Sequence, residues 1–186
     1  MINKIVTSKE AILAVCRELA AEHGLQSLNM RKVAEKCNVS VGSVYNYFPS
    51  KADLIAATIQ DVWQSIFNME KICKQSVTFP EYVTWIFESV QVGVAEYPNF
   101  FTAHSVSFAS SDKGKARQVM MEYFGHIKAG MLDALQNDHK VKPVAFSEAF
   151  TQIAFVDFVF SSLLALLMKK ESSCTMLTEI IKRSIY

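Results

Sequence analysis

The 186-residue sequence contains few of the residues that break helices. It has only six glycines and four prolines, and no stretch shows a convincing alternation of apolar and polar residues. Because 51% of the residues are hydrophobic, the chain can bury a substantial core. The sequence therefore predicts an all-α protein with long helices.

The sequence also lacks the motifs of common enzyme and metal sites. The four cysteines, at positions 16, 37, 73 and 174, form no CxxC pair and no metal-binding spacing. There is no glycine-rich phosphate loop, nucleophile elbow or His-Glu-x-x-His motif. We expect no catalytic site, metal or cofactor, and a helical enzyme remains only an alternative. A redox role for Cys37 or Cys174 is a second alternative, although only Cys37 has a neighbouring cation, Lys36.

Neither a strong charge excess nor a membrane-spanning run is present. The 19 Lys and Arg nearly balance the 18 Asp and Glu. The first residues, Met-Ile-Asn-Lys-Ile-Val, lack the apolar core of a signal peptide. The longest apolar run, residues 153–168, is interrupted by Asp157 and is shorter than the roughly 20 residues of a membrane span. We expect a cytoplasmic protein without a membrane partner.

Residues 29–51 carry the pattern of a helix-turn-helix. Apolar residues at i, i+3, i+4 and i+7 indicate a short helix, and Asn38 follows it at a position suited to the left-handed conformation. Ser40 is a good N-cap for a second helix, which Pro49 ends. The side of this second helix that is predicted to be buried carries Val41, Val44 and Phe48.

The opposite side of the second helix is small and polar, and we predict that it reads DNA. A surface helix usually carries Lys and Glu, whereas a bare polar face fits a groove of the duplex. The hydroxyls of Tyr45 and Tyr47 should contact phosphate, and Arg31 and Lys51 should add charge there. The predicted DNA-binding residues are Arg31, Ser40, Gly42, Ser43, Tyr45, Asn46, Tyr47 and Lys51.

Residues 8–60 resemble the tetracycline-repressor (TetR) family. The frame Ala-x3-Asn-Val-Ser-x3-Val at residues 34–44 is similar to the general helix-turn-helix pattern. Residues 45–54, Tyr-Asn-Tyr-Phe-Pro-Ser-Lys-Ala-Asp-Leu, are similar to the signature of the family. The resemblance implies an N-terminal three-helix DNA-binding head joined by a long helix to a helical ligand-binding and dimerisation domain. We expect the first domain at residues 1–50 and the second at residues 51–186.

Helical periodicity continues through the chain. Capping boxes at Thr7-Ser8-Lys9-Glu10 and Thr78-Phe79-Pro80-Glu81 mark two helix starts. For residues 99–111 the sequence does not decide between a short helix and a loop. The predicted helices are residues 7–23, 29–37, 40–48, 50–74, 78–97, 112–136, 146–169 and 174–185.

The segment at residues 146–169 is apolar on nearly all sides, so it must be buried on all sides. A subunit interface supplies such burial, and a stripe of small residues, Ala154, Ser161, Ser162 and Ala165, would admit a partner helix. The TetR resemblance likewise implies a homodimer formed through the last two helices. The alternative is that this helix is the core of its own subunit.

The aromatic residues of the second half predict a pocket for an apolar or amphipathic small-molecule effector. The TetR resemblance favours this pocket over the alternative that the aromatic residues only fill the core. His104 and His126 lie among apolar residues, where we expect satisfied core groups. The predicted lining is Trp63, Trp85, Phe101, His104, Met120, Phe124, Phe155 and Asp157.

Asp157 is the one acid in residues 153–168. Because an unpaired carboxylate is costly to bury, we expect it to have a partner. Three partners remain open: the Ser161 hydroxyl, a His or Lys of the same or the partner subunit, and a cationic aromatic ligand.

The sequence thus predicts a DNA-binding transcriptional regulator. We expect a repressor that binds an inverted-repeat operator in double-stranded DNA as a homodimer and leaves it when the effector binds. The alternative is a DNA-binding regulator that responds to a protein partner or acts without a ligand.

Overall fold

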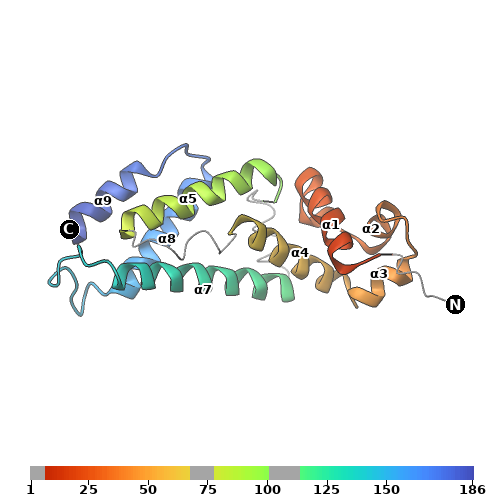
Figure 1. The fold of residues 1–186 in the computed structure, drawn as a ribbon, viewed down its shortest axis with the longest axis horizontal. Helices are drawn as coiled ribbons and strands as arrows, with labels where there is room; N and C mark the ends of the chain where they lie inside the picture. The colour runs from red at the N-terminus through yellow and green to blue at the C-terminus, as the bar shows by residue number, and fades with distance from the viewer. Residues whose placement is uncertain (1–6, 68–77, 101–113) are drawn as a thin grey trace. The chain divides into compact units, whose positions relative to one another are not determined.

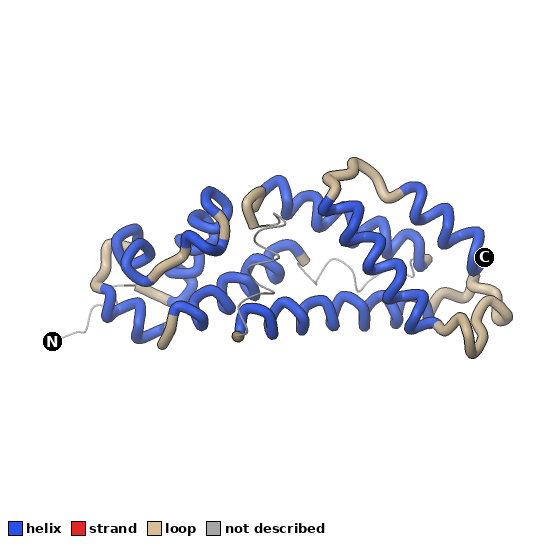
Figure 2. The backbone as a smooth tube through the Cα atoms, turned by 180° about the vertical axis from the view of Figure 1, so that it is seen from behind, coloured by secondary structure: helices blue, strands red, loops and turns tan. Residues whose placement is uncertain are grey.

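The computed structural model describes residues 7–67, 78–100 and 114–186. Every regular element in these residues is a helix (Figures 1 and 2), which confirms the predicted all-α class. None of these helices is long and apolar enough to cross a membrane. The chain divides into two compact units: unit 1 contains Met1–Ile66 and Gly93–Glu122, and unit 2 contains Phe67–Val92 and Tyr123–Tyr186. The expected domain boundary at residue 50 stays a prediction.

Unit 1 begins with the helices of the N-terminal head (Figure 1). These are α1 (Lys9–His23), the 3-10 helix η1 (Leu25–Ser27), α2 (Met30–Lys36), α3 (Val41–Tyr47) and α4 (Lys51–Ile66). Helix α1 packs against α2 and α4, and α2 packs against α3. The apolar side chains buried among these helices include Ile12, Cys16, Leu19, Val33, Val44, Leu54 and Ile59.

The N-cap of α1 is Ser8, so the predicted capping box beginning at Thr7 is wrong. Ser8 Oγ accepts a hydrogen bond from the backbone N–H of Ala11 at 3.1 Å. The capping box at the start of α5 is confirmed, because Glu81 accepts from both the backbone N–H and the hydroxyl of Thr78, each at 2.7 Å.

The helices that follow in the described part of the chain are α5 (Phe79–Glu96), α7 (Lys115–Gln136), α8 (Gln152–Met168) and α9 (Thr175–Ile185). The division between the units falls inside α5 and α7. Within unit 2, α8 packs against α9.

Two predicted helix bounds change. Helix α8 does not start at residue 146, because Thr151 Oγ1 caps it by accepting from Ala154 N–H at 3.1 Å, and Ser147 and Phe150 close a turn before it. Helix α4 ends at Ile66 and Phe67 lies in a bend, so the helix predicted over residues 50–74 is interrupted at Phe67. The predicted helix bounds within residues 68–77 and 101–113 lie outside the described residues.

Asp138 is a buried polar junction in unit 2, with 8% of its surface exposed. Its Oδ2 accepts from the backbone N–H of Phe79 at 2.7 Å and from the Tyr186 hydroxyl, and its Oδ1 accepts from Lys140 N–H at 3.0 Å. Phe79 is the first residue of α5, so Asp138 supplies a cap from a distant part of the chain. Burial raises the pKa of this carboxyl, but the hydrogen bonds from Tyr186, Phe79 and Lys140 outweigh burial and lower it overall.

Replacing Asp138 with Asn should therefore destabilise the protein in a pH-dependent way. A carboxylate with a lowered pKa stabilises the fold above its unfolded pKa, and this contribution is lost as the pH falls through the folded pKa. At about pH 7, Asp138→Asn should lower the free energy of unfolding by about 1.5–3 kcal/mol, the range for hydrogen bonds to charged groups. Urea unfolding from neutral to acidic pH should show this difference shrinking.

The matched control for this measurement is Asp133→Asn. Asp133 is exposed on α7 and accepts from Asn137 at 3.1 Å. Its replacement should change the free energy of unfolding by no more than about 0.5 kcal/mol. Equal effects of the two substitutions would contradict the role given to Asp138.

Candidate nucleic-acid interface

The turn before α3 has the predicted geometry. Asn29 Oδ1 caps α2 by accepting from Lys32 N–H at 2.9 Å. Asn38 adopts a φ of 53°, the left-handed conformation predicted for the turn. The N–H of Val39 then donates to the Ala34 carbonyl at 3.0 Å, which closes α2. A helix-turn-helix is therefore present at residues 29–47.

Helix α3 is short and is held by caps and by burial of one side. Ser40 Oγ accepts from Ser43 N–H at 3.1 Å, as its N-cap position predicts. Val44 and Phe48 are buried, with 0% and 2% of their surfaces exposed, and Val41 is half-buried. The predicted inner side of α3 is thus confirmed.

The outer side of α3 is open to solvent. Tyr45 is 49% exposed and Tyr47 is 39% exposed, and Gly42 and Asn46 are also exposed. Ser43 is half-buried, and its hydroxyl lies 2.9 Å from the Ser40 hydroxyl. The exposed surface therefore combines one bare backbone position, one amide and two phenol rings.

Tyr47 joins α3 to the segment before α1. Its hydroxyl donates to the backbone carbonyl of Thr7 at 2.8 Å. A phenol has one proton to donate, so Tyr47 must release Thr7 before its hydroxyl can donate to a phosphate. No sequence pattern predicts this bond, because it joins residues 40 positions apart.

Two of the predicted phosphate-binding cations lie free at the edges of the exposed face. Arg31 is in the first turn of α2, Lys51 is the first residue of α4, and both are exposed. In the described part of the chain neither forms an ion pair, whereas Lys36 pairs with Glu22 at 3.6 Å. A third cation, Lys9, lies over the Phe48 ring at 6.0 Å. Arg31 and Lys51 are therefore available to phosphate.

The acid nearest to Lys51 in sequence has its own partners. Asp53 accepts from Ser50 Oγ at 2.7 Å and pairs with Lys115 of α7 within unit 1. Hydrogen bonds from the Lys115 ammonium and the Ser50 hydroxyl lower the pKa of Asp53. The carboxylate is thus ionised at neutral pH, and Lys115 offsets a charge that would otherwise oppose phosphate binding.

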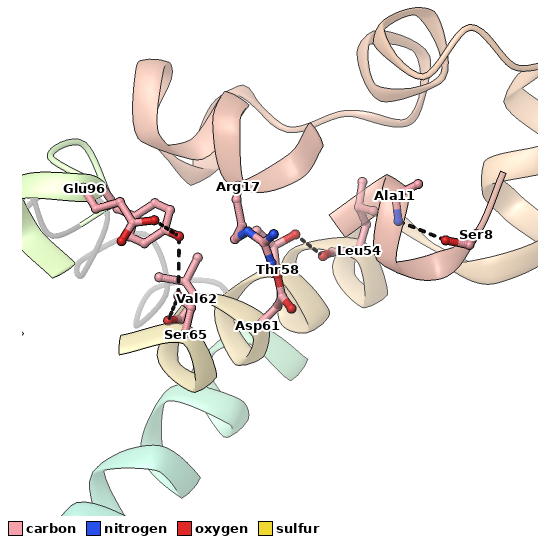
Figure 3. A network of polar contacts seen from close by, with 10 residues as sticks. Ser8, Ala11, Arg17, Leu54, Thr58, Asp61, Val62, Ser65 and Glu96 are labelled. Carbon is pink, nitrogen blue, oxygen red and sulfur yellow. Dashed lines mark hydrogen bonds and ion pairs between the residues drawn. The ribbon is translucent and has the colours of Figure 1, made fainter. Parts of the chain in front are cut away.

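A polar network joins α1 to α4 (Figure 3). Arg17 of α1 forms an ion pair with Asp61 of α4, and both side chains are partly buried. Thr58, one turn before Asp61, donates its hydroxyl to the Leu54 carbonyl at 2.8 Å. The helix that precedes the helix-turn-helix is therefore tied to the helix that follows it.

Two residues of the predicted effector pocket lie together in unit 1. Trp63 Nε1 donates to Met120 Sδ at 3.3 Å, and both side chains are buried. Phe101 and His104, from the same predicted lining, lie outside the described residues. The contact between Trp63 and Met120 is a packing contact of the unit 1 core.

In unit 2, the other predicted pocket residues occupy separate places. Phe124 packs on Phe160 with ring centroids 5.2 Å apart, and Phe155 packs on Phe79 at 6.0 Å. Trp85 lies in a groove of about 300 Å³ between α5 and α9, lined by Thr78, Pro80, Glu81, Thr84, Trp85, Glu88, Thr178 and Lys182. The effector pocket as a whole stays a prediction.

Asp157 is not buried, contrary to the prediction. Its side chain is 52% exposed and pairs with Lys128 of α7 at 2.9 Å. The predicted burial failed because the face of α8 that carries Asp157 is uncovered in the single chain. The lysine partner is one of the three that the sequence left open. His126 is also exposed instead of being a core residue.

The three cysteines in the described residues, Cys16, Cys37 and Cys174, give no support to a redox or metal site. Burial raises the pKa of Cys16 to about 12, and it also raises the pKa of Cys37 and of Cys174. A raised pKa disfavours the reactive thiolate. Among the described residues, no group of three or more His, Cys, Asp or Glu side chains could hold a metal ion.

Comparisons with known proteins support this interpretation of the head. The model of the family described as "Bacterial regulatory proteins, tetR family" matches residues 12–58. The chain is 36% identical over 63 residues to the HTH-type transcriptional repressor KstR of Rhodococcus jostii, covering 34% of this chain and 30% of KstR. It is 36% identical over 84 residues to the HTH-type transcriptional regulator UidR of Escherichia coli, covering 45% of this chain and 41% of UidR. The chain thus spans less than half the length of these curated relatives.

The similarity in fold covers more of the chain than the similarity in sequence does. The transcriptional regulator FadR of Bacillus subtilis, solved in complex with stearoyl-CoA, superposes with a TM-score of 0.66 at 18% identity, over 96% of this chain and 100% of FadR. The match of residues 12–58 to a family of regulatory proteins favours the predicted regulator over the alternative of a helical enzyme. Residues 12–58, which contain the helix-turn-helix at residues 29–47, thus match the tetR family of bacterial regulatory proteins, and the fold of the chain resembles that of solved regulators.

Proposed function

We propose that this protein is a homodimeric repressor that binds an inverted-repeat operator through α3 and leaves it when a small effector binds. The observation that carries the proposal is the outer side of α3, where Gly42, Tyr45 and Asn46 are exposed on a helix whose other side is buried. Such a face lies in the region that matches the family, residues 12–58. A major groove admits a helix and accepts this face without any charged side chain having to lose its water.

The exposed groups support a division of roles in DNA binding. The Asn46 amide both donates and accepts, which suits the edge of an adenine. Gly42 has only Ser40 Oγ near it, 3.7 Å from where a Cβ would lie, so the backbone there can approach a base closely. Tyr45, Arg31 and Lys51 hold phosphates on either side. Because α3 carries no Arg or Lys to bind guanine, we infer that DNA shape contributes to specificity.

The salt dependence of DNA binding tests the role of Lys51. Loss of one phosphate contact should lower the slope of log affinity against log salt by about 0.9, so Lys51→Ala should lose about one unit of slope. The measurement is a titration of a bound promoter fragment at several salt concentrations. As a control, Lys140→Ala, which removes an exposed cation from unit 2, should leave the slope unchanged. An unchanged slope for Lys51→Ala would refute this phosphate contact.

A second copy of the chain is the partner that best fits the uncovered side of α8 and α9. Ile153, Phe158 and Met168 on α8 are 65%, 54% and 54% exposed, and Met176 and Ile180 on α9 are 75% and 40% exposed. Since α8 and α9 pack against each other, these side chains belong to one two-helix layer of unit 2. Two such layers facing each other would form a four-helix bundle. The exposed small residues Ala154, Ser161 and Ala165 would allow close approach.

Replacing Phe158 with Asp should therefore dissociate the dimer. Burial of an unpaired charge costs about 3 kcal/mol or more, which corresponds to about a 100-fold or larger increase in the dimer dissociation constant. Light scattering on a size-exclusion column would measure the change in mass. Val144→Asp is the matched control, because Val144 is 87% exposed in the loop before α8 and should tolerate the same charge. A Phe158→Asp variant that stays dimeric would exclude this interface.

An apolar, neutral or anionic molecule is the effector that the observations favour. FadR, which shares the fold, binds stearoyl-CoA in its solved complex. In unit 2, the one acid expected to hold a cationic ligand, Asp157, is exposed and already pairs with Lys128. Aromatic side chains, including Phe79, Phe124 and Phe155, supply the apolar packing that such an effector requires.

A thermal-shift screen tests the effector and its charge class. A ligand at 100 times its dissociation constant adds about 2.7 kcal/mol of stability, which corresponds to a rise in Tm of about 5–10 °C for a chain of this size. We expect this rise with apolar neutral or anionic compounds, including long-chain acyl thioesters, and expect Asp157→Asn to preserve it. A rise with lipophilic cations that Asp157→Asn abolishes would contradict this assignment. No rise with any compound would favour a regulator that has a protein partner or no ligand.

A further inference from the structure

The last turn of α5 belongs to the same compact unit as the DNA-binding head. Residues up to Val92 are part of unit 2, and those from Gly93 are part of unit 1, although α5 is one unbroken helix from Phe79 to Glu96. The residues that follow it, Tyr97 to Phe100, are also in unit 1. A single helix therefore runs from the proposed effector-binding unit into the unit that carries α3.

Within unit 1, the end of α5 packs tightly on the end of α4. A Cβ at Gly93 would lie 2.6 Å from Cδ1 and Cγ1 of Ile66, so a larger residue there would force the Ile66 side chain to move. The Tyr97 hydroxyl lies 3.4 Å from Ser65 Oγ and donates to Glu96 at 2.7 Å, and Figure 3 shows Ser65 and Glu96 on either side of this contact. The end of α4 thus has little freedom to move away from the end of α5.

Asn99 holds α1 in a different way. Its side-chain amide donates to the carbonyl of Ala21 at 2.7 Å and to that of Glu22 at 2.9 Å. These carbonyls belong to the last turn of α1, where the carbonyl groups lack partners within the helix. Both hydrogens of one amide group are therefore used to cap a helix that lies 77 and 78 residues earlier in the sequence.

The opposite end of α1 leads to the recognition helix. Thr7, just before α1, accepts the hydrogen bond from Tyr47, and Lys9 lies over the Phe48 ring. Between the two ends, Arg17 pairs with Asp61 of α4. Helix α1 thus connects Asn99 at its C-terminal end to α3 at its N-terminal end, and it also packs against α2 and α4.

We propose that Asn99 is a positioning residue for DNA binding: it orients the recognition helix by fixing the C-terminal end of α1 to the end of α5. The inference rests on the proposed regulator function. Helix α4 already joins the helix-turn-helix covalently to the chain that follows, and Asn99 adds a second, non-covalent connection through α1. In a dimer, the orientation of each head sets the distance between two recognition helices, which must match half-sites roughly 34–36 Å apart. Without the Asn99 amide, the affinity for DNA should therefore depend less strongly on the spacing between the two half-sites.

The test measures spacing selectivity and does not rely on affinity alone. The full-length wild type first selects a duplex from a random DNA library, and footprinting then locates its two half-sites. Affinities are measured for that duplex and for versions with one base pair added or removed between the half-sites. For Asn99→Ala, the ratio of affinities between the best and the altered spacings should fall by about fivefold or more, the lower end of typical coupling between sites.

Asn137→Ala is the matched control. The Asn137 amide also caps a helix, because it donates to the Asp133 carbonyl in the last turn of α7 at 2.9 Å, and this contact lies wholly in unit 2. Asn137→Ala should leave the ratio of affinities between the best and the altered spacings at its wild-type value. Asn99→Asp, which keeps the shape of the side chain but places a carboxylate against the same carbonyls, is the second variant should Asn99→Ala fail to fold. It should lower the ratio in the same way.

The outcomes separate the inference from the function on which it rests. If Asn99 variants bind more weakly at every spacing but keep the wild-type ratio, Asn99 only stabilises α1 and the inference is overturned. The same holds if Asn137→Ala lowers the ratio equally. If the wild type selects no DNA sequence, the regulator function itself fails, and the inference fails with it.

Discussion

Burial of Val44 and Phe48 is the constraint on which the proposed DNA-binding face depends. A helix of seven residues does not persist alone in water, because each turn gained costs nearly as much chain entropy as its hydrogen bonds return. Helix α3 is therefore helical only while its inner side is packed and its Ser40 cap is formed. The polar outer side keeps its helical geometry because the inner side of the same helix packs against apolar residues.

The head could be predicted from sequence because its determinants are local. A cap, a left-handed asparagine, a terminating proline and a period of 3.6 residues all act over fewer than ten residues, and the structure places them as expected. The one local error, the cap of α1, is an exchange between the adjacent Thr7 and Ser8, which have the same capping group. Local chemistry alone does not choose between two such neighbours.

The remaining contacts were not predictable because they join residues far apart in sequence. The bonds of Asn99 to α1, of Lys115 to Asp53 and of Tyr186 to Asp138 each cross at least 48 residues and leave no pattern in the intervening chain. Asp157 shows the opposite kind of error, because the sequence predicted a burial that the structure does not have. An apolar run around an acid predicts burial, but Asp157 lies on a side of α8 that is exposed in the single chain, and there it pairs with Lys128.

The bare position at Gly42 bears on how operator preference diverges within such a family. A side chain added there meets only Ser40 Oγ, at an ordinary contact distance of 3.7 Å, and Asn46 points away from the core as well. New side chains on this face cost no repacking, whereas changes at Val44 or Phe48 would disturb the core. In the proposed mode of DNA binding, stability and sequence preference are thus encoded by different residues of one short helix. If α3 reads the operator in this way, single substitutions on its outer side change the DNA target of a duplicated copy of the protein while the core stays packed.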